Sequence, residues 1–345
     1  MDTENTLIID EAYGFNSINH LQTRDGIIFN DKISCTTYIL KPVCESFERK
    51  VFTSSIYKHL NNHGFTNTDS IILTKNNNLT MEIDGKKYIC NKVLVGKQCS
   101  GENLQEVKKA AKLLATMHNC AKGFTNKVAL ELNSFVLTEN ENKNTYLKNE
   151  LGELKEIFSH RSNELSRFKK LATRRKSVFD YEYRAIADKY CNKAFELSQA
   201  LKESKYDEIS AYYNTHGIIC HKKYTFHNVV FSENCEGGII NFEQASIDLP
   251  LFDIVNLIKR RMKKCGWKVA EALEILEEYS KIRNLSKAEF EIMRITLSYP
   301  QKLWRVVNKY YNSRRSWCEK SCLLKLSEFQ SESEEIEKFI NDFTF

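Results

Sequence analysis

The chain has 345 residues, of which 42% are hydrophobic and 28% charged, and its formal net charge is +6. This composition excludes an intrinsically disordered chain, and the length is sufficient for one large core or two packed lobes. No apolar run approaches the roughly 18 residues that cross a bilayer, so we expect no transmembrane segment, and the acidic residues 1–15 do not resemble a secretory signal.

Eleven cysteines are scattered along the chain without a Cys-x-x-Cys pair. Their spacing argues against a zinc ribbon or a thioredoxin-type site. An odd number of irregularly spaced cysteines fits thiols that are kept reduced in a cytoplasm, where they behave as small buried hydrophobes. Later cross-linking between chains remains an alternative.

The first part of the chain alternates short β-branched or aromatic stretches with turn residues, which is typical of strands. Residues 46–61 differ, because their apolar side chains recur at helical spacing before Gly64. We therefore expect a small sheet with one helix over residues 1–95. Its predicted strands cover residues 26–32, 36–41, 71–74, 79–83 and 87–90.

Residues 96–345 are predominantly helical in pattern, so the fold class is α+β. Three short apolar stretches interrupt this part and predict a β-ribbon that carries a loop: residues 217–221, 229–231 and 238–242. A polar stretch at residues 140–144 is too short to be a disordered linker. The predicted helices cover residues 104–118, about 146–168, 180–201 and the segment from Pro250 to the end.

A cluster of cations lies within six positions of one predicted helix: Lys259, Arg260, Arg261, Lys263 and Lys264. The apolar residues between them predict a solvated helix face, and an acidic protein partner is the alternative.

Aromatic and basic residues alternate near Trp304, Tyr310 and Tyr311, as they do on some protein surfaces that bind nucleic acids. Their helical spacing indicates packing residues, so we expect no nucleic-acid partner.

Residues 221–228, His-Lys-Lys-Tyr-Thr-Phe-His-Asn, resemble the catalytic loop of kinases and aminoglycoside phosphotransferases. In that loop a His-x-Asp is followed by Asn five residues after the Asp. His221, in a core structural position, and Asn228 match, but Lys223 stands where the Asp is expected. Because a protonated lysine cannot accept the substrate proton, the loop is degenerate, and a neutral Lys223 acting as base is the less favoured alternative.

Residues 239–243, Ile-Ile-Asn-Phe-Glu, similarly resemble the strand that carries the metal-binding Asp of these enzymes, with Asn241 in its place. Glu243 is a candidate for a displaced metal-binding carboxylate, if the strand is regular. Asp248 and Asp253 match the element Asp-x-Pro-x-x-Asp, whose second Asp buttresses the catalytic loop in the family.

The carboxy-terminal segments 297–305 and 309–312 resemble those of CotS-type spore coat proteins. Residues 38–41 and 113–118 resemble the lysine strand and the lobe-junction helix of the same family. Taken in order, these elements identify residues 14–339 as a CotS-family chain. The resemblance implies a protein-kinase-like, aminoglycoside-phosphotransferase-type fold with two lobes, at residues 1–95 and 96–345, in a degenerate, pseudokinase form.

The resemblance also implies that Lys41 orients phosphates and pairs with Glu48 or Glu45 on the next helix. No glycine-rich loop precedes Lys41, because Gly26 is the only glycine between residues 16 and 63. We therefore expect at most weak binding of ATP or another nucleotide, without magnesium. A direct contact between the Lys223 ammonium and an anion is an alternative use of the cleft.

The family resemblance implies a structural or assembly protein of the spore coat, made in the mother-cell cytoplasm, with other coat proteins as partners. The alternative is a small-molecule or protein phosphotransferase with unorthodox site chemistry.

Overall fold

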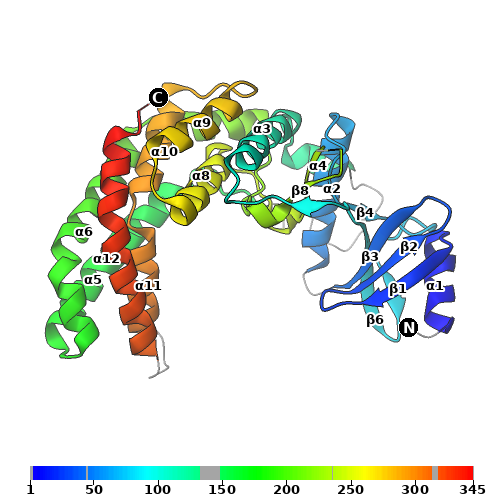
Figure 1. Cartoon of the computed structure of the whole chain (residues 1–345), viewed down its shortest axis with the longest axis horizontal. Coiled ribbons are helices and arrows are strands. Elements are labelled where there is room, and N and C mark those ends of the chain that lie inside the picture. Colours follow the sequence, from blue (N-terminus) through cyan, green and yellow to red (C-terminus); the bar gives the residue numbers. More distant parts are fainter. Residues whose placement is uncertain (1–2, 44–45, 133–147, 235, 313–317, 345) are drawn as a thin grey trace. The chain divides into compact units, whose positions relative to one another are not determined.

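The computed structural model describes residues 3–43, 46–132, 148–234, 236–312 and 318–344. Glu45, the polar stretch at 140–144 and the expected helix start near residue 146 lie outside these ranges. The chain divides into two compact units (Figure 1). The first contains residues 1–149, 213–257 and 278–283, and the second contains residues 150–212, 258–277 and 284–345.

A six-stranded antiparallel sheet forms the amino-terminal part of the first unit. Its order is β1-β2-β3-β6-β4, and β5 also pairs with β6. The five strands expected from the sequence are confirmed, and β1 was missed because four of its six side chains are exposed, which hides the strand alternation. The strands are β1 Ser17–Gln22, β2 Ile27–Asp31, β3 Thr36–Pro42, β4 Ser70–Ile72, β5 Met81–Ile83 and β6 Lys86–Lys92.

Alternation along β3 divides its side chains between two covered faces of this sheet. Tyr38 and Leu40 face α1 (Thr3–Tyr13), in a core cluster with Ile9 and Phe29. Lys41 pairs with Ile89 across β3 and β6, and therefore lies on the opposite face.

The opposite face of the sheet is covered by α2 (Phe47–Asn62), the helix expected from residues 46–61. Its core contact joins Val51 to Leu79 and Ile89. Ser46 starts this helix, because its side chain accepts a hydrogen bond from the Arg49 amide. Lys41 and the helix that follows it thus lie on the same side of the sheet.

The rest of the first unit carries residues 221–228 and 239–243, the two segments that resemble kinase motifs. A three-stranded sheet has the order β7-β8-β9, and helices pack around it. The elements are β7 Lys97–Gln98, β8 Val229–Phe231, β9 Gly237–Ile239, α3 Leu104–Cys120, α4 Asn126–Leu132, and parts of α7 Tyr206–His216, α8 Leu251–Cys265 and α9 Val269–Ser280.

Two expected strands are shorter in the structure. Residues 217–221 contribute only an isolated bridge from Cys220 to Ser246. The strand expected over 238–242 ends at Ile239, because Asn241 takes a left-handed backbone (φ 67°) and a 3₁₀ turn, Phe242–Gln244, follows. Asn241 and Glu243 therefore do not share a strand face.

The second unit is helical, with α5 and α6 side by side (Figure 1). α11 packs against α5 and α12, and α12 also packs against α6 and α10. Tyr310 stacks on Phe179 and Tyr311 on Phe168, with ring centroids 3.9 and 5.2 Å apart, so these tyrosines are packing residues. The helices are α5 Glu153–Arg174, α6 Val178–Glu203, α10 Lys287–Ser298, α11 Gln301–Asn312 and α12 Cys318–Asp342.

Within the described ranges, no helix is long and apolar enough to cross a membrane.

The turn between β1 and β2 predicts a sharp glycine requirement. A Cβ on Gly26 would stand 2.2 Å from the Leu40 carbonyl oxygen, and its φ is +152°. Gly26→Ala should lower the free energy of unfolding by about 3 kcal/mol, in urea titration. Gly64→Ala is the control, because nothing lies within 4 Å of its added Cβ (φ +87°), and should cost only about 1 kcal/mol. Equal losses would contradict the close contact.

Candidate functional site

The loop at residues 221–228 rests on the buried carboxylate of Asp253. This residue lies in the first turn of α8, just after Pro250. The backbone amide of His221 donates to its Oδ2 at 2.6 Å, and the amide of Lys222 donates to Oδ1 at 2.7 Å. The carboxylate therefore fixes the direction of the chain where the loop begins.

A buried histidine completes the support. His118 Nε2 lies 3.2 Å from Asp253 Oδ2, and its Nδ1 lies 2.7 Å from the Tyr279 hydroxyl. Burial lowers the pKa of His118. Although burial alone would raise the pKa of Asp253, the hydrogen bonds that it accepts, first among them the one from His118, hold the pKa below its ordinary value. A neutral His118 thus donates from Nε2 to an ionised Asp253 and accepts from Tyr279.

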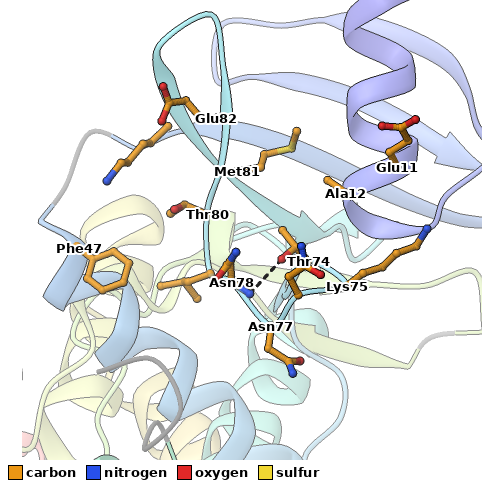
Figure 2. Close-up of a pocket in the computed structure, with 13 residues that line it drawn as sticks. Glu11, Ala12, Phe47, Thr74, Lys75, Asn77, Asn78, Thr80, Met81 and Glu82 are labelled. Carbon is orange, nitrogen blue, oxygen red and sulfur yellow. Dashed lines mark hydrogen bonds between the residues drawn. The ribbon is translucent and has the colours of Figure 1, made fainter. Parts of the chain in front are cut away.

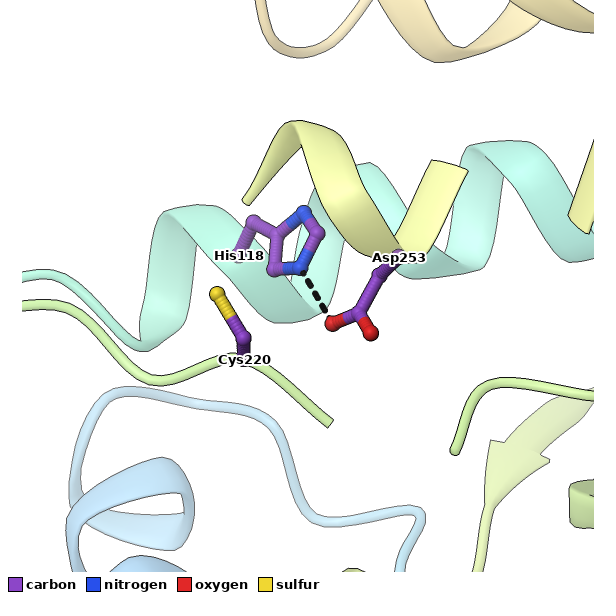
Figure 3. Close-up of side chains that lie close together, drawn as sticks. All are labelled: His118, Cys220 and Asp253. Atoms are coloured by element: carbon purple, nitrogen blue, oxygen red, sulfur yellow. Dashed lines mark hydrogen bonds and ion pairs between the residues drawn. The ribbon is translucent and has the colours of Figure 1, made fainter. Parts of the chain in front are cut away.

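His118, Asp253 and Cys220 lie together with the spacing of metal ligands (Figure 3). Each ligand atom already has a protein partner, however, since Cys220 Sγ donates to the Asp248 carbonyl at 2.8 Å. Burial also raises the pKa of the Cys220 thiol well above its ordinary value, so the sulfur stays protonated. The cluster fits a hydrogen-bonded buttress better than a metal site.

Two adjacent lysines in the loop have different surroundings. Lys222 has a left-handed backbone (φ 65°), and its ammonium forms an ion pair with buried Asp248. Lys223 is exposed. The side chain that replaces the expected loop Asp is therefore presented to solvent, while its neighbour neutralises an internal carboxylate. No sequence motif indicates the ion pair of Lys222 with Asp248, because a lysine at this position matches no known pattern.

His221 joins the loop to the segment after β9. It is buried, and its Nε2 lies 2.9 Å from the Ile240 carbonyl, while its Nδ1 accepts from the Lys223 amide at 3.3 Å. Burial lowers the pKa of His221, so the ring is neutral. Its place is thus structural in this fold.

The side chains of Asn228 and Asn241 are bonded to each other. Asn241 Nδ2 donates to Asn228 Oδ1 at 2.9 Å, and Asn228 Nδ2 donates to the Lys223 carbonyl at the same distance. The Ile240 amide also donates to the Asn228 carbonyl at 3.0 Å. The loop and the segment at 240–241 are therefore joined by direct amide hydrogen bonds.

Asp69, a residue that the sequence motifs did not indicate, lies buried beside Asn241. It accepts from the Tyr57 hydroxyl at 2.7 Å and from the Asn241 amide at 3.2 Å. Burial raises the pKa of Asp69 to about 6, and the charge of Lys41 opposes that rise. Within the described part of the chain no ion pair joins Lys41 to Glu48. The carboxylate on which the charge of Lys41 acts is that of Asp69.

Cations on α2 hold the turn that follows Asn241. Arg49 donates from Nε to the Glu243 carbonyl at 2.8 Å and from Nη2 to the Ala245 carbonyl at 2.5 Å. Lys50 Nζ lies 3.4 Å from Glu243 Oε1. The Glu243 carboxylate is thus engaged by a lysine. These contacts join residues almost 200 positions apart, which no local pattern reveals.

A hollow of about 640 Å³ lies elsewhere in the first unit, beside the loop between β4 and β5 (Figure 2). Glu11 and Ala12 of α1, Phe47 of α2 and the loop residues Asn77 and Asn78 line it. None of the described lining comes from residues 221–228 or 239–243. The hollow is separate from the kinase-type loop.

Residues 6–343 match the profile of the family described as "Spore coat putative kinase YutH". Spore coat protein S of Bacillus subtilis (strain 168) is 22% identical to this chain over 306 residues, which cover 88% of the chain and 82% of that protein.

Solved structures that are similar to this chain include phosphotransferases. The aminoglycoside phosphotransferase of Alicyclobacillus acidocaldarius subsp. acidocaldarius DSM 446 aligns with a TM-score of 0.78 and 17% identity, over 98% of this chain and 94% of that one. AMP-bound spectinomycin phosphotransferase APH(9)-Ia aligns with a TM-score of 0.62 and 13% identity, over 99% of both chains. At such identities these likenesses establish the fold alone, which confirms the predicted kinase-like class.

The buttress predicts a large stability effect at Asp253. Asp253→Ala leaves three donors without their acceptor, namely the His118 ring and the amides of His221 and Lys222. We expect a loss of about 3 to 5 kcal/mol in the free energy of unfolding by urea. Lys223→Ala, at an exposed position, should change it by less than about 0.5 kcal/mol. Similar midpoints for Asp253→Ala and the wild type would rule out the buttress.

The raised pKa of Asp69 predicts a pH effect. Because the folded pKa lies above the unfolded one, this carboxyl stabilises the fold fully below its unfolded pKa, and that contribution is lost as the pH rises through about 6. From about pH 4.5 to 7, the wild type should lose about 2 kcal/mol relative to Asp69→Asn in urea unfolding. Parallel pH profiles for the two proteins would show that Asp69 is not perturbed.

Proposed function

The chain belongs to the spore coat YutH family, and from this membership we propose that it is a structural or assembly protein of the spore coat, built on a kinase-like fold that has lost metal-dependent phosphoryl transfer. The hydrogen bond from Asn241 Nδ2 to Asn228 Oδ1 carries this proposal. In a kinase, both positions supply oxygen ligands to magnesium. Here one presents an N–H and the other is its acceptor.

The charges around this pair also oppose a divalent cation. Magnesium is held by oxygen ligands, usually one or two of them carboxylates. The Glu243 carboxylate is engaged by Lys50, so a magnesium ion would have to displace a bound ammonium. The exposed ammonium of Lys223 adds a further repulsive charge near the loop. The residues present therefore do not fit magnesium.

Acceptance of a substrate proton is also disfavoured. The ammonium group of Lys223 is a donor only, whereas the carboxylate that it replaces accepts or orients that proton. Lys223 therefore occupies the position of the loop Asp but has the opposite hydrogen-bonding character.

Nucleotide binding, if retained, is weak and independent of magnesium in this proposal. The turn between β1 and β2 is closed by its own bonds, since both the amide and the hydroxyl of Thr23 donate to the Gly26 carbonyl at 2.8 Å. Those donors are not available to cradle a phosphate. Lys41 lies on this side of the sheet, and its charge acts on the nearby carboxylate of Asp69.

We place the protein in the mother-cell cytoplasm first and then in the coat, with other coat proteins as partners, because its relative in Bacillus subtilis is named a spore coat protein. The partner surface that we propose consists of only part of the basic cluster on α8. Arg261 is buried and donates from Nε and Nη2 to Glu271, at 3.0 and 2.7 Å, so its charge is used internally. Arg260, Lys263 and Lys264 are exposed and would attract an acidic partner.

Restoring both carboxylates tests the loss of metal chemistry. In Lys223→Asp combined with Asn241→Asp, magnesium should tighten ATP binding at least tenfold, about 1.4 kcal/mol, in calorimetric titration. The wild type should show no such dependence and no ADP release. Lys223→Asn is the control, because it removes the ammonium without adding a carboxylate. Turnover by the wild type that Lys223→Ala abolishes would contradict the proposal.

The coat proposal predicts a charge effect on assembly. Reversal of Arg260 and Lys263 to Glu should reduce incorporation of a fluorescently tagged chain into the coat severalfold, and the interaction should weaken as salt rises. Reversal of Lys170 and Lys202, exposed in the same unit, changes the net charge equally and should have no effect. Equal incorporation of both variants would reduce the α8 cluster to a solvated helix face.

A further inference from the structure

The short turn between α5 and α6 carries a run of cations at one end of the helical hairpin. Residues 175–177 join the two helices. Arg174, Arg175 and Lys176 are consecutive, and all three are exposed. No Asp or Glu occurs in residues 165–179. These three cations, called the basic turn below, therefore make this end of the hairpin strongly positive.

Contacts with α11 anchor the basic turn. The Ser177 and Tyr310 hydroxyls lie 2.8 Å apart. The guanidinium carbon of Arg175 lies 5.5 Å from the centroid of the Tyr311 ring. Ser177 also forms a capping box with Asp180, which starts α6 directly after the turn. The cations are therefore presented by a turn that is tied to the helices on both sides.

The nearby carboxylates are engaged elsewhere. Lys169, just over one turn earlier in α5, forms an ion pair with Asp188. Asp180 is buried, and its oxygens accept from the Tyr311 hydroxyl and from the Ser177 amide. Among the described residues, the basic turn itself forms no ion pair. Its positive charge therefore remains available to an anion outside the chain.

Two apolar side chains lie exposed beside the basic turn. Val178 and Tyr181 are 61% and 55% exposed. They are three residues apart at the start of α6 and therefore share a face. Because helical side chains lean toward the amino end of their helix, both lean toward the basic turn. The Arg184 guanidinium carbon lies 4.4 Å from the centroid of the Tyr181 ring and adds a further cation.

A basic surface with exposed apolar side chains fits the interface of an anionic membrane. Each Lys or Arg close to such a membrane raises the binding constant about fivefold. Apolar and aromatic side chains enter the headgroup region, while basic side chains stay among the phosphates. An acidic protein surface would satisfy the cations but would bury neither Val178 nor Tyr181. The apolar pair therefore favours a membrane.

We propose that the basic turn, with Val178 and Tyr181, binds the surface of an anionic lipid membrane without crossing it. Glu182 is an exposed carboxylate on the same face of α6, and its charge opposes this binding. The three cations of the turn outnumber it. This surface uses neither the loop at 221–228 nor the basic cluster on α8, so the inference is independent of the proposed function.

Flotation of the whole chain with lipid vesicles tests the proposal. The wild type should float with vesicles of phosphatidylcholine and phosphatidylglycerol but not with phosphatidylcholine alone, and salt should weaken the binding. Arg174→Gln combined with Lys176→Gln should weaken it about tenfold. Lys202→Gln combined with Lys338→Gln is the matched control, because both lysines are exposed near the carboxyl ends of α6 and α12. Equal binding by these two double variants would overturn the proposal.

The apolar contribution is tested separately. Val178→Ser combined with Tyr181→Ser should weaken vesicle binding severalfold, also at raised salt, and should leave the melting temperature unchanged because both side chains are exposed. Glu182→Gln should strengthen binding to the anionic vesicles. Vesicle binding that is unchanged in the serine variant would contradict insertion of the apolar pair.

Polyglutamate is the probe for an acidic protein partner. The account predicts that it binds more weakly than anionic vesicles do, because it offers no apolar region to Val178 and Tyr181. Binding of polyglutamate by the wild type and the serine variant alike, without binding of vesicles, would assign the surface to an acidic protein and overturn the membrane proposal.

Discussion

The buried carboxylate of Asp253 determines the geometry of the loop on which every functional conclusion depends. It accepts from two consecutive loop amides and from His118, and it lies in the first turn of α8. None of these bonds involves Lys223 or Asn241. Under the proposed function, the kinase-like fold can therefore persist although Lys223 and Asn241 stand where the family resemblance implies carboxylates, because the support of the loop uses different residues.

Where a metal ion would bridge the loop and the segment after β9, this chain uses neutral amides. The Asn241–Asn228 bond joins the loop to the segment after β9, and the Arg49 contacts join α2 to residues 243–245. These bonds are made by side chains of the chain itself, which suits the proposed role of a protein that acts through its surface.

Local patterns were sufficient to predict five strands of the sheet and α2, because strand alternation and helical spacing are properties of short segments. The kinase-like class came from the family resemblance. Local patterns failed for β9, whose apolar run continues past Ile239 although the backbone turns left-handed at Asn241. Residues 221–228 and 239–243 could be located by resemblance, yet the partners of those side chains could not. Asp69, Arg49 and Lys50 reach the site only through tertiary contacts, and the burial of Arg261 depends on Glu271 in the next helix.

The central claim is that amide hydrogen bonding at Asn228 and Asn241 has replaced metal binding. The most direct test follows the side-chain amide signals of these two residues by ¹⁵N NMR, with a non-hydrolysable ATP analogue and increasing Mn²⁺ as a paramagnetic substitute for magnesium. The account predicts that both pairs of amide signals keep their shifts and linewidths until manganese broadens the whole spectrum. Selective broadening of the Asn228 and Asn241 signals at low manganese would place a metal at these residues and contradict it.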